Sequence, residues 1–201
     1  SNTFNDLPGV VSGLHDLLYT PNNLLGGSNV NNIDYYSSSA SVFDPRGKTY
    51  GEDTNAKYQI MLAKYNKNFA DYKTLDRSAS PAQIEAMIAE TYDTSLAAAD
   101  AVKSANNLIQ FFEDQMTQHT QKIPSLANTQ LASLNSYSAS TNSHLSDLLT
   151  ISSTIKNNKS TIVDADRSIN ENTQSLAKLV TGTDSLDLAS AELTVQSRKN
   201  A

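Results

Sequence analysis

Residues 127–180 read ANTQLASLNSYSASTNSHLSDLLTISSTIKNNKSTIVDADRSINENTQSLAKLV, and this stretch decides the fold. Alternate steps of four and three residues trace one seam along it, with no Pro or Gly inside. The seam comprises Ala127, Leu131, Leu134, Ser138, Thr141, Leu145, Leu148, Ser152, Ile155, Lys159, Ile162, Asp166, Ile169, Thr173, Leu176 and Val180. Such a repeat predicts one long helix that packs through a narrow stripe. At about 1.5 Å of rise per residue, this helix would extend roughly 80 Å.

The two positions of this repeat differ in strength. One keeps Leu or Ile through the second half of the stretch, whereas the other holds Ser152, Lys159, Asp166 and Thr173. This asymmetry predicts that the second half packs against one partner helix rather than inside a bundle. We interpret Lys159 and Asp166 as a solvated flank; the alternative is a pair of polar seam residues that set the register.

A tight reversal and a second heptad helix precede the long helix, which we place at about 125–181. Ile123-Pro124-Ser125 predicts the reversal, so the preceding helix should run antiparallel to the long one. That helix, about 81–121, begins at Ser80-Pro81-Ala82-Gln83, which offers a capping box with Pro at the first helical position.

An aromatic helix and a short final helix complete the expected set. At about 54–76 a four-three pattern contains Tyr58, Leu62, Tyr65, Phe69 and Tyr72. We interpret this stripe as core, with an aromatic platform for a ligand as the alternative. Beyond the long helix, a break at 182–185 leads to a last helix at about 185–201.

The first fifty residues differ in composition from the rest. They hold most of the Gly, three of the five Pro and an Asn/Ser-rich stretch from Asn22 to Ser41. We therefore predict a loop-rich segment over 1–50, with one short amphipathic helix at about 4–19 that docks by its apolar face. Residues 51–201 should form an elongated helical coiled-coil domain. The expected fold class is all-α: an elongated antiparallel coiled-coil hairpin or helical bundle with a loop-rich N-terminal segment.

The composition excludes several functional classes. Of the 201 residues 38% are apolar and none is Trp, which argues against a large globular core. The net charge of −6 and the lack of a basic cluster argue against nucleic acid or an anionic membrane as partner. No apolar run is long enough to span a membrane, so we expect membrane attachment only through further parts of a longer parent protein.

The sequence contains no recognisable catalytic motif. His15, His119 and His144 lie far apart without metal-ligand spacing, and we expect each at the surface. Phosphate-binding loops and a Ser nucleophile elbow do not occur, and the absence of Cys excludes thiolate chemistry. We therefore expect no enzyme activity, no cofactor and no metal site.

The stretch from Leu179 to Gln196 resembles the hairpin region of HlyD-like membrane fusion proteins, the periplasmic adaptor subunits of bacterial exporters. In that family a Leu-rich helix reaches a Gly-containing turn, followed by Ser, a Leu-Asp pair and an Ala/Leu-patterned returning helix. The matching residues, in order, are Gly182, Ser185, Leu186, Asp187, Ala191 and Leu193. The resemblance covers about the last 75 residues of the chain.

The resemblance implies a helical hairpin between two halves of a lipoyl-like β-domain, in a protein anchored by an N-terminal transmembrane helix. The tip of such a hairpin contacts export components, which points to the turn residues Thr181, Gly182, Thr183, Asp184, Ser185 and Leu186. The alternative is that Gly182 and Ser185 serve only as ordinary helix-capping residues. The upstream positions where adaptors carry Arg and Leu hold Ser and Lys here, which argues against docking on an outer-membrane channel.

The expected function is therefore that of a non-enzymatic extracytoplasmic segment that spans distance in a transmembrane export system. Its partners would be proteins, either further copies of itself or exporter and channel components. The alternatives are a ligand-binding helical-bundle ectodomain of a membrane receptor and a secreted helical surface protein. A pocket with convergent polar groups near the aromatic stripe would favour the receptor.

Overall fold

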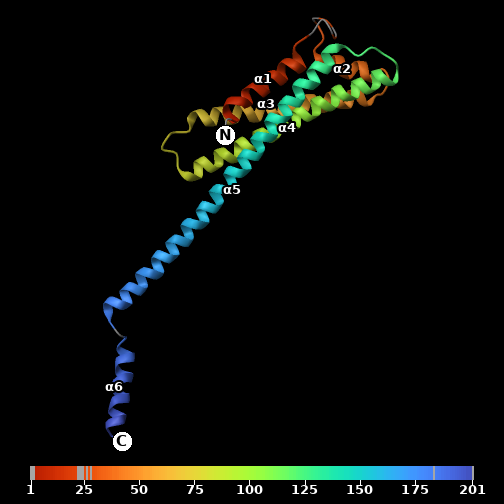
Figure 1. The fold of residues 1–201 in the computed structure, drawn as a ribbon. Coiled ribbons are helices and arrows are strands. Elements are labelled where there is room, and N and C mark those ends of the chain that lie inside the picture. The colour runs from red at the N-terminus through yellow and green to blue at the C-terminus, as the bar shows by residue number, and fades with distance from the viewer. Residues whose placement is uncertain (1–2, 22–24, 26, 28, 183, 201) are drawn as a thin grey trace. The chain divides into compact units, whose positions relative to one another are not determined.

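The computed structural model describes residues 3–21, 25, 27, 29–182 and 184–200, and all regular secondary structure among them is α-helical. The helices are α1 (Thr3–Tyr19), α2 (Asn32–Ser41), α3 (Arg46–Thr74), α4 (Pro81–Gln118), α5 (Ser125–Thr181) and α6 (Ser185–Lys199) (Figure 1). The all-α class predicted from the sequence is confirmed. The chain divides within α5 into two units, residues 1–152 and 153–201, which we name the bundle unit and the distal unit.

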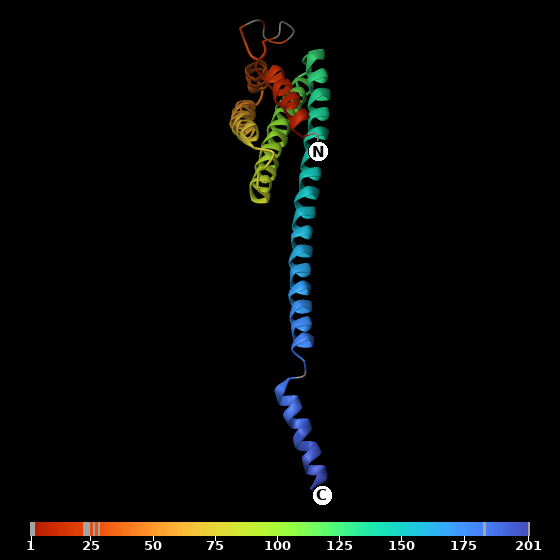
Figure 2. The same ribbon diagram turned by 90° about the vertical axis from the view of Figure 1, so that its left-hand side faces the viewer.

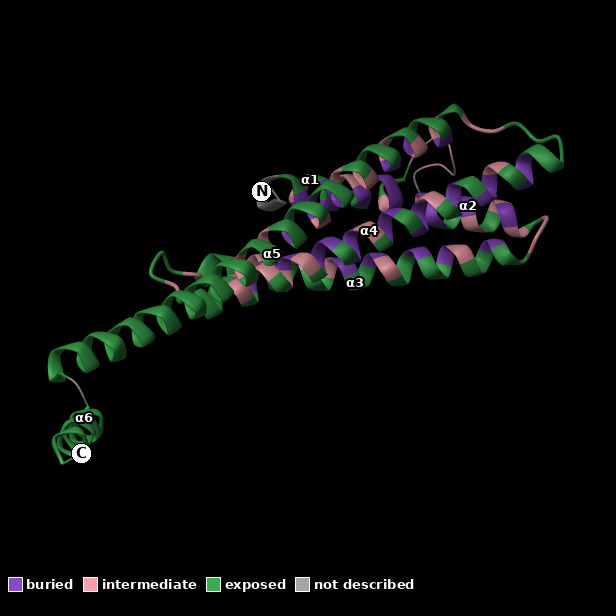
Figure 3. Ribbon diagram, turned by 60° about the horizontal axis from the view of Figure 1, so that its bottom comes forward, coloured by how far each residue is buried: buried purple, intermediate pink, exposed green. Residues whose placement is uncertain are grey.

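Helix α4 is the centre of the bundle unit. It contacts α1, α2 and α3, and most of its length is buried on several sides (Figure 3). Small residues on this helix, such as Ala98, Ala101 and Ala105, allow its neighbours to approach closely, while Phe112 packs edge-on against Tyr36 of α2. Its N-terminus has the predicted capping box, in which Ser80 accepts from the backbone N–H of Gln83.

Helix α1 forms where the sequence predicts it and docks by the predicted face. The buried apolar residues are Leu7, Val10, Val11, Leu14, Leu17 and Leu18. This face packs into the core with α4, and α1 also lies against α5 (Figure 2). A Cβ at Gly13 would overlap the hydroxyl group of Tyr137, so the missing side chain is what permits this approach.

Helix α2 occupies part of the segment that the sequence analysis placed in a loop. Asn31 caps it by accepting from the backbone N–H of Asp34, and Ile33, Tyr36 and Ala40 form a buried stripe. The many Asn and Ser residues have weak helix propensity, but packing against α3 and α4 overrides it. The expectation of a loop-rich segment over 1–50 with only one helix is therefore wrong for 32–41.

Helix α3 begins at Arg46, eight residues before the predicted start at 54. Gly is a weak helix former, yet Gly47 and Gly51 both lie inside the helix, where α3 crosses α2. A Cβ at Gly47 would lie 2.7 Å from the backbone nitrogen of Ser41, and one at Gly51 would lie 2.6 Å from Cβ of Ser37. These glycines therefore serve helix packing instead of interrupting the helix.

The predicted aromatic stripe of α3 is buried only in part. Tyr58 is in the core, Tyr65 and Phe69 are half-buried and stacked on each other, and Tyr72 is exposed. The buried line of the helix instead continues from Tyr58 through Met61 to Asn68. The four-three pattern of apolar residues does not include Asn68, whose amide is polar. It is buried because it donates to Oγ1 of Thr91 on α4, 3.1 Å away.

The reversal between α4 and α5 lies where Pro124 predicts it, and α5 begins at Ser125. The backbone N–H of Gln121 donates to the carbonyl of Met116 at 2.8 Å, the pattern of a Schellman motif. Thr120 adopts the left-handed conformation with φ of 52°. A β-branched residue is unusual there, because its Cβ crowds the backbone.

In the bundle unit, the buried seam of α5 differs from the predicted one in its weaker position. The strong position is confirmed, since Ala127, Leu134, Thr141 and Leu148 are buried. The predicted companions Leu131, Ser138 and Leu145 are only half-buried, and Ser152 is exposed. Their place is taken by residues one position earlier, namely Gln130, Tyr137, His144 and Ile151, of which Gln130 and His144 are buried.

Polar contacts explain why this companion position is buried despite its residue types. Gln130 accepts from the hydroxyl of Tyr36 at 2.5 Å and donates to the backbone carbonyl of Leu17 at 3.4 Å. His144 lies with Nε2 3.9 Å from a carboxylate oxygen of Asp6. The apolar pattern favours Leu131 and Leu145, but a polar side chain that is hydrogen-bonded, as Gln130 is, can also occupy a seam. The expectation that all three His are surface residues is wrong for His144.

Candidate functional site

The described residues hold no cluster of catalytic or metal-ligating groups. His15 is exposed on α1 with Nδ1 2.8 Å from the hydroxyl of Tyr58, and His119 stacks on Phe43. No group of three or more His, Asp or Glu among the described residues could hold a metal ion. No described helix is both long and apolar enough to cross a membrane.

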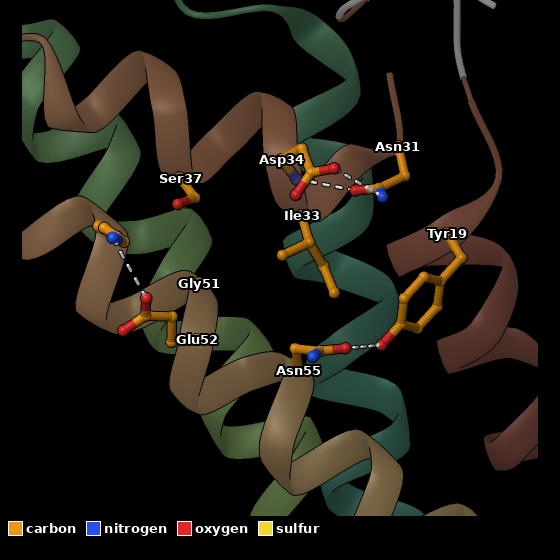
Figure 4. Close-up of a pocket in the computed structure, with 9 residues that line it drawn as sticks. Tyr19, Asn31, Ile33, Asp34, Ser37, Gly51, Glu52 and Asn55 are labelled. Carbon is orange, nitrogen blue, oxygen red and sulfur yellow. Dashed lines mark hydrogen bonds and ion pairs between the residues drawn. The ribbon is translucent and has the colours of Figure 1, made fainter. Parts of the chain in front are cut away.

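A polar groove opens between the end of α1, the start of α2 and the first half of α3 (Figure 4). Its volume is about 450 Å³, and its lining residues are Tyr19, Asn31, Ile33, Asp34, Ser37, Lys48, Gly51, Glu52 and Asn55. Tyr19 donates to the amide oxygen of Asn55 at 2.6 Å, and Asn31 donates to Asp34 at 2.9 Å. Most of its polar groups therefore bind each other.

The charges in this groove also partly neutralise one another. Lys48 lies 3.7 Å from Glu52, both of them exposed, so the pair is worth little. Partial burial raises the pKa of Tyr19, a hydrogen bond from Gln59 lowers it, and the nearby charge of Asp34 raises it further. Tyr19 thus stays neutral at ordinary pH. Nothing in this arrangement activates a nucleophile or positions an acid–base pair.

The aromatic residues considered as a ligand platform, Tyr58, Tyr65, Phe69 and Tyr72, do not line this groove. Tyr58 instead closes a ring cluster with His15 and Tyr19, whose centroids lie 6.0 Å and 4.8 Å from its own. This cluster packs α1 on α3. The combination of an aromatic stripe with convergent polar groups, which would have favoured a receptor pocket, is absent from this groove.

The predicted turn residues lie between α5 and α6, and those that are described are exposed. Thr181 ends α5, and Gly182 follows with φ of 81°, the left-handed conformation typical of a helix C-cap. Asp184 caps α6 by accepting from the backbone N–H of Leu186 at 3.2 Å. Thr183 lies outside the described residues. Ser185 is the first residue of α6, and the side chain of Leu186 is 78% exposed.

The distal unit exposes an unusual number of large apolar side chains. From Lys156 to Asn200 every described residue is exposed. The apolar residues that are at least half exposed are Ile162, Val163, Ile169, Leu176, Leu179 and Val180 on α5, and Leu186, Leu188, Leu193 and Val195 on α6. Single exposed apolar residues are common, but rows of them at helical spacing mark interaction surfaces.

The structure does not bring these two rows together. Among the described residues, α6 buries no side chain and makes no packing contact with α5 of the extent seen between α3 and α4. Of these α6 residues, Leu186 and Leu193 are predicted from the sequence, whereas Leu188 is not, although a Leu-x-Leu pattern at a helix start indicates it.

A scan against protein-family models, a search of curated proteins and a search of solved structures each found no match to this chain.

Proposed function

We propose that this chain is a non-enzymatic interaction segment of an extracytoplasmic adaptor in a transmembrane export system. The observation that supports this proposal is the exposed apolar surface of the distal unit, where two rows of Leu, Ile and Val remain uncovered. Such surface is costly in water, at roughly 25 cal/mol per Å² of apolar area. It therefore calls for a covering helix, which the returning arm of an adaptor hairpin would supply.

In this proposal α5 and α6 are the two arms of an antiparallel coiled-coil hairpin, with the turn around Gly182 as its tip. The bundle unit provides a folded base, because its core is complete without the distal unit. The resemblance of 179–196 to HlyD-like membrane fusion proteins supports the same interpretation. The turn residues Thr181 to Leu186 would then face an exporter component.

Photo-crosslinking in the source organism tests this proposal. A photoreactive amino acid at Ser185, at the turn, is compared with one at Val42, which is 78% exposed in the bundle unit. We expect Ser185 to form a covalent adduct with a membrane transport protein and Val42 to form none. Equal adducts from both positions, or none from Ser185, would contradict the proposal.

The extracytoplasmic location is tested separately. The chain contains no Cys, so Ser197→Cys provides a single thiol on exposed α6. In intact cells with a permeabilised outer envelope, we expect a membrane-impermeant maleimide to label this thiol fully. Labelling only after lysis would place the segment in the cytoplasm and rule out an adaptor.

A further inference from the structure

The apolar row on the distal part of α5 follows the register of its buried part. In the bundle unit, each strong seam residue of α5 is followed three residues later by the second residue of the seam. Examples are Ala127 with Gln130 and Thr141 with His144, all of which are buried. Extended along the same helix, this register gives Ile155, Asn158, Ile162, Ala165, Ile169, Asn172, Leu176 and Leu179. The distal seam then contains no charged residue.

This register agrees with the interpretation of Lys159 and Asp166 as a solvated flank. It also moves Thr173 from the seam to the flank, whereas Asn158 and Asn172 move into the seam. The bundle unit shows that such a position accepts polar side chains. Gln130 is buried there, and its amide oxygen and amide nitrogen each make a hydrogen bond. Uncharged amides inside a seam are a known way to fix the register of a partner helix.

Helix α6 carries a stripe that matches the last part of this seam. Leu186, Ala189, Leu193 and Gln196 are separated by steps of three, four and three residues. Counted backward from the turn, Leu179, Leu176, Asn172 and Ile169 have the same steps. Only residues 182–184 separate the two helices, so an antiparallel return would place these stripes opposite each other.

We propose that α6 packs antiparallel on α5 in one register, with the layers Leu179/Leu186, Leu176/Ala189, Asn172/Leu193 and Ile169/Gln196. This inference rests on the hairpin of the proposed function and names the residues that close it. In heptad notation, Ile169 and Leu176 of α5 and Leu186 and Leu193 of α6 are a residues, and the residue three positions after each is a d residue. Each layer therefore places an a residue of one helix against a d residue of the other, as antiparallel packing requires. The seam is dry at the turn and becomes more polar away from it.

The short link between the helices favours α6 over a second copy as the occupant. A flexible link of a few residues gives an effective concentration in the millimolar range. A second chain at micromolar concentration would therefore compete at a disadvantage of about a thousandfold. Gly182, in a left-handed C-cap, and Asp184, as an N-cap, already provide the ends that a compact turn needs.

Disulfide trapping in the purified full chain tests the register. The chain has no Cys, so Asn172→Cys with Leu193→Cys creates one defined thiol pair. Residues in one seam layer lie close enough for the Cβ separation of about 3.5–4.5 Å that a disulfide needs. We expect near-complete intramolecular bond formation under mild oxidation, seen as loss of both thiols and a monomeric mass.

Two matched pairs keep this test decisive. Gln174→Cys with Leu193→Cys puts one thiol on the opposite side of α5, and we expect at least tenfold slower bond formation. Thr173→Cys with Leu193→Cys represents the other register. Faster trapping of the Thr173 pair than of the Asn172 pair would overturn the proposed seam while leaving a hairpin intact.

Mainly intermolecular bonds, increasing with protein concentration, would instead identify a second copy as the occupant and overturn the proposal.

A pair of isoleucines tests the extent of the seam. Ile169 and Ile162 occupy the same heptad position and are 61% and 60% exposed, but only Ile169 falls opposite α6 in the proposed register. We expect Ile169→Ser to slow trapping of the Asn172/Leu193 thiol pair several-fold and Ile162→Ser to leave it unchanged. Equal effects of the two substitutions would contradict the register. Photo-crosslinking at Ser185 could still succeed in that case, so this failure is distinguishable from failure of the proposed function.

Discussion

At the scale of single residues, Thr120 is the clearest site of backbone strain. It is exposed, adopts φ of 52° and follows the last turn of α4. A left-handed conformation costs an L-residue about 1–2 kcal/mol, and Gly avoids this cost. We expect Thr120→Gly to raise the free energy of unfolding by about 1 kcal/mol, measured by urea denaturation. Thr129→Gly, inside α5, is the control and should lower the stability by about 0.3–0.5 kcal/mol.

Glu113 should make stability dependent on pH. Its Oε1 is buried without a hydrogen-bond partner, and desolvation, then the charge of Asp114, raises its pKa above the usual 4.5. The pKa of Glu113 is higher in the folded state than in the unfolded state. Its contribution to folding stability is therefore fully present below the unfolded-state pKa and is lost as pH rises through the folded-state pKa. We therefore expect Glu113→Gln to reduce the loss of stability above about pH 4.5.

The measurement for Glu113 is a series of urea denaturation curves between pH 4 and 7. Glu192→Gln, on the exposed surface of α6, removes the same charge outside the bundle core. Its curves should follow those of the parent chain. If Glu113→Gln followed them as well, burial of the carboxyl group would have no energetic consequence for folding.

At the scale of helices, the crossing of α2 and α3 depends on a missing side chain. A Cβ at Gly51 would lie 2.6 Å from both Cβ and Oγ of Ser37, closer than atoms can approach. We expect Gly51→Ala to destabilise the protein by about 2 kcal/mol, because overpacking outweighs the gain in helix propensity. Thermal or urea denaturation measures the effect.

Two further variants separate packing from propensity at this crossing. Gly9 lies inside α1, and a Cβ added there would have no other atom within 4 Å, so Gly9→Ala should stabilise by about 0.5–1 kcal/mol. Ser37→Gly should restore most of the stability that Gly51→Ala removes, since it deletes the clashing atoms. A stable Gly51→Ala variant would mean that the two helices can separate at little cost.

Most helices could be predicted from the sequence because their signals are local. Pro81, Pro124 and Gly182 mark helix ends through their own backbone preferences, and the ends found in the structure agree. Helix α2 could not be predicted, because its Asn and Ser residues gain their helical state from packing on α3 and α4. The companion seam of α5 was wrong for a related reason, since Gln130 is buried through hydrogen bonds to residues distant in sequence.

At the scale of the whole molecule, the candidate site was predictable only as a location. The turn around Gly182 follows from its residues, and the described part of it is exposed; its role as a contact tip stays a prediction. What covers the apolar rows of α5 and α6 does not follow from a heptad repeat. Such a repeat specifies that one helix packs on another, but not which helix. The short link at 182–184 supplies the missing argument, because it makes α6 the nearest available partner.

The division of the chain predicts that the bundle unit folds by itself. Every buried residue of the described chain lies at or before Leu148, so a fragment of residues 1–152 retains the whole core. We expect this fragment and the full chain to have the same free energy of unfolding within about 0.5 kcal/mol, because exposed residues contribute little. Urea denaturation followed by circular dichroism compares the two.

A shorter fragment shows whether the boundary itself matters. Ending the chain at residue 140 removes the buried residues Thr141, His144 and Leu148 while leaving α1 to α4 intact in sequence. Loss of Leu148 alone should cost about 2–5 kcal/mol, so this fragment should unfold at a much lower urea concentration than the 1–152 fragment. Equal stability of the two fragments would mean that the end of α5 in the bundle unit adds nothing to the core. A 1–152 fragment less stable than the full chain would show that the distal unit supports the bundle, contrary to the role of an independent interaction surface.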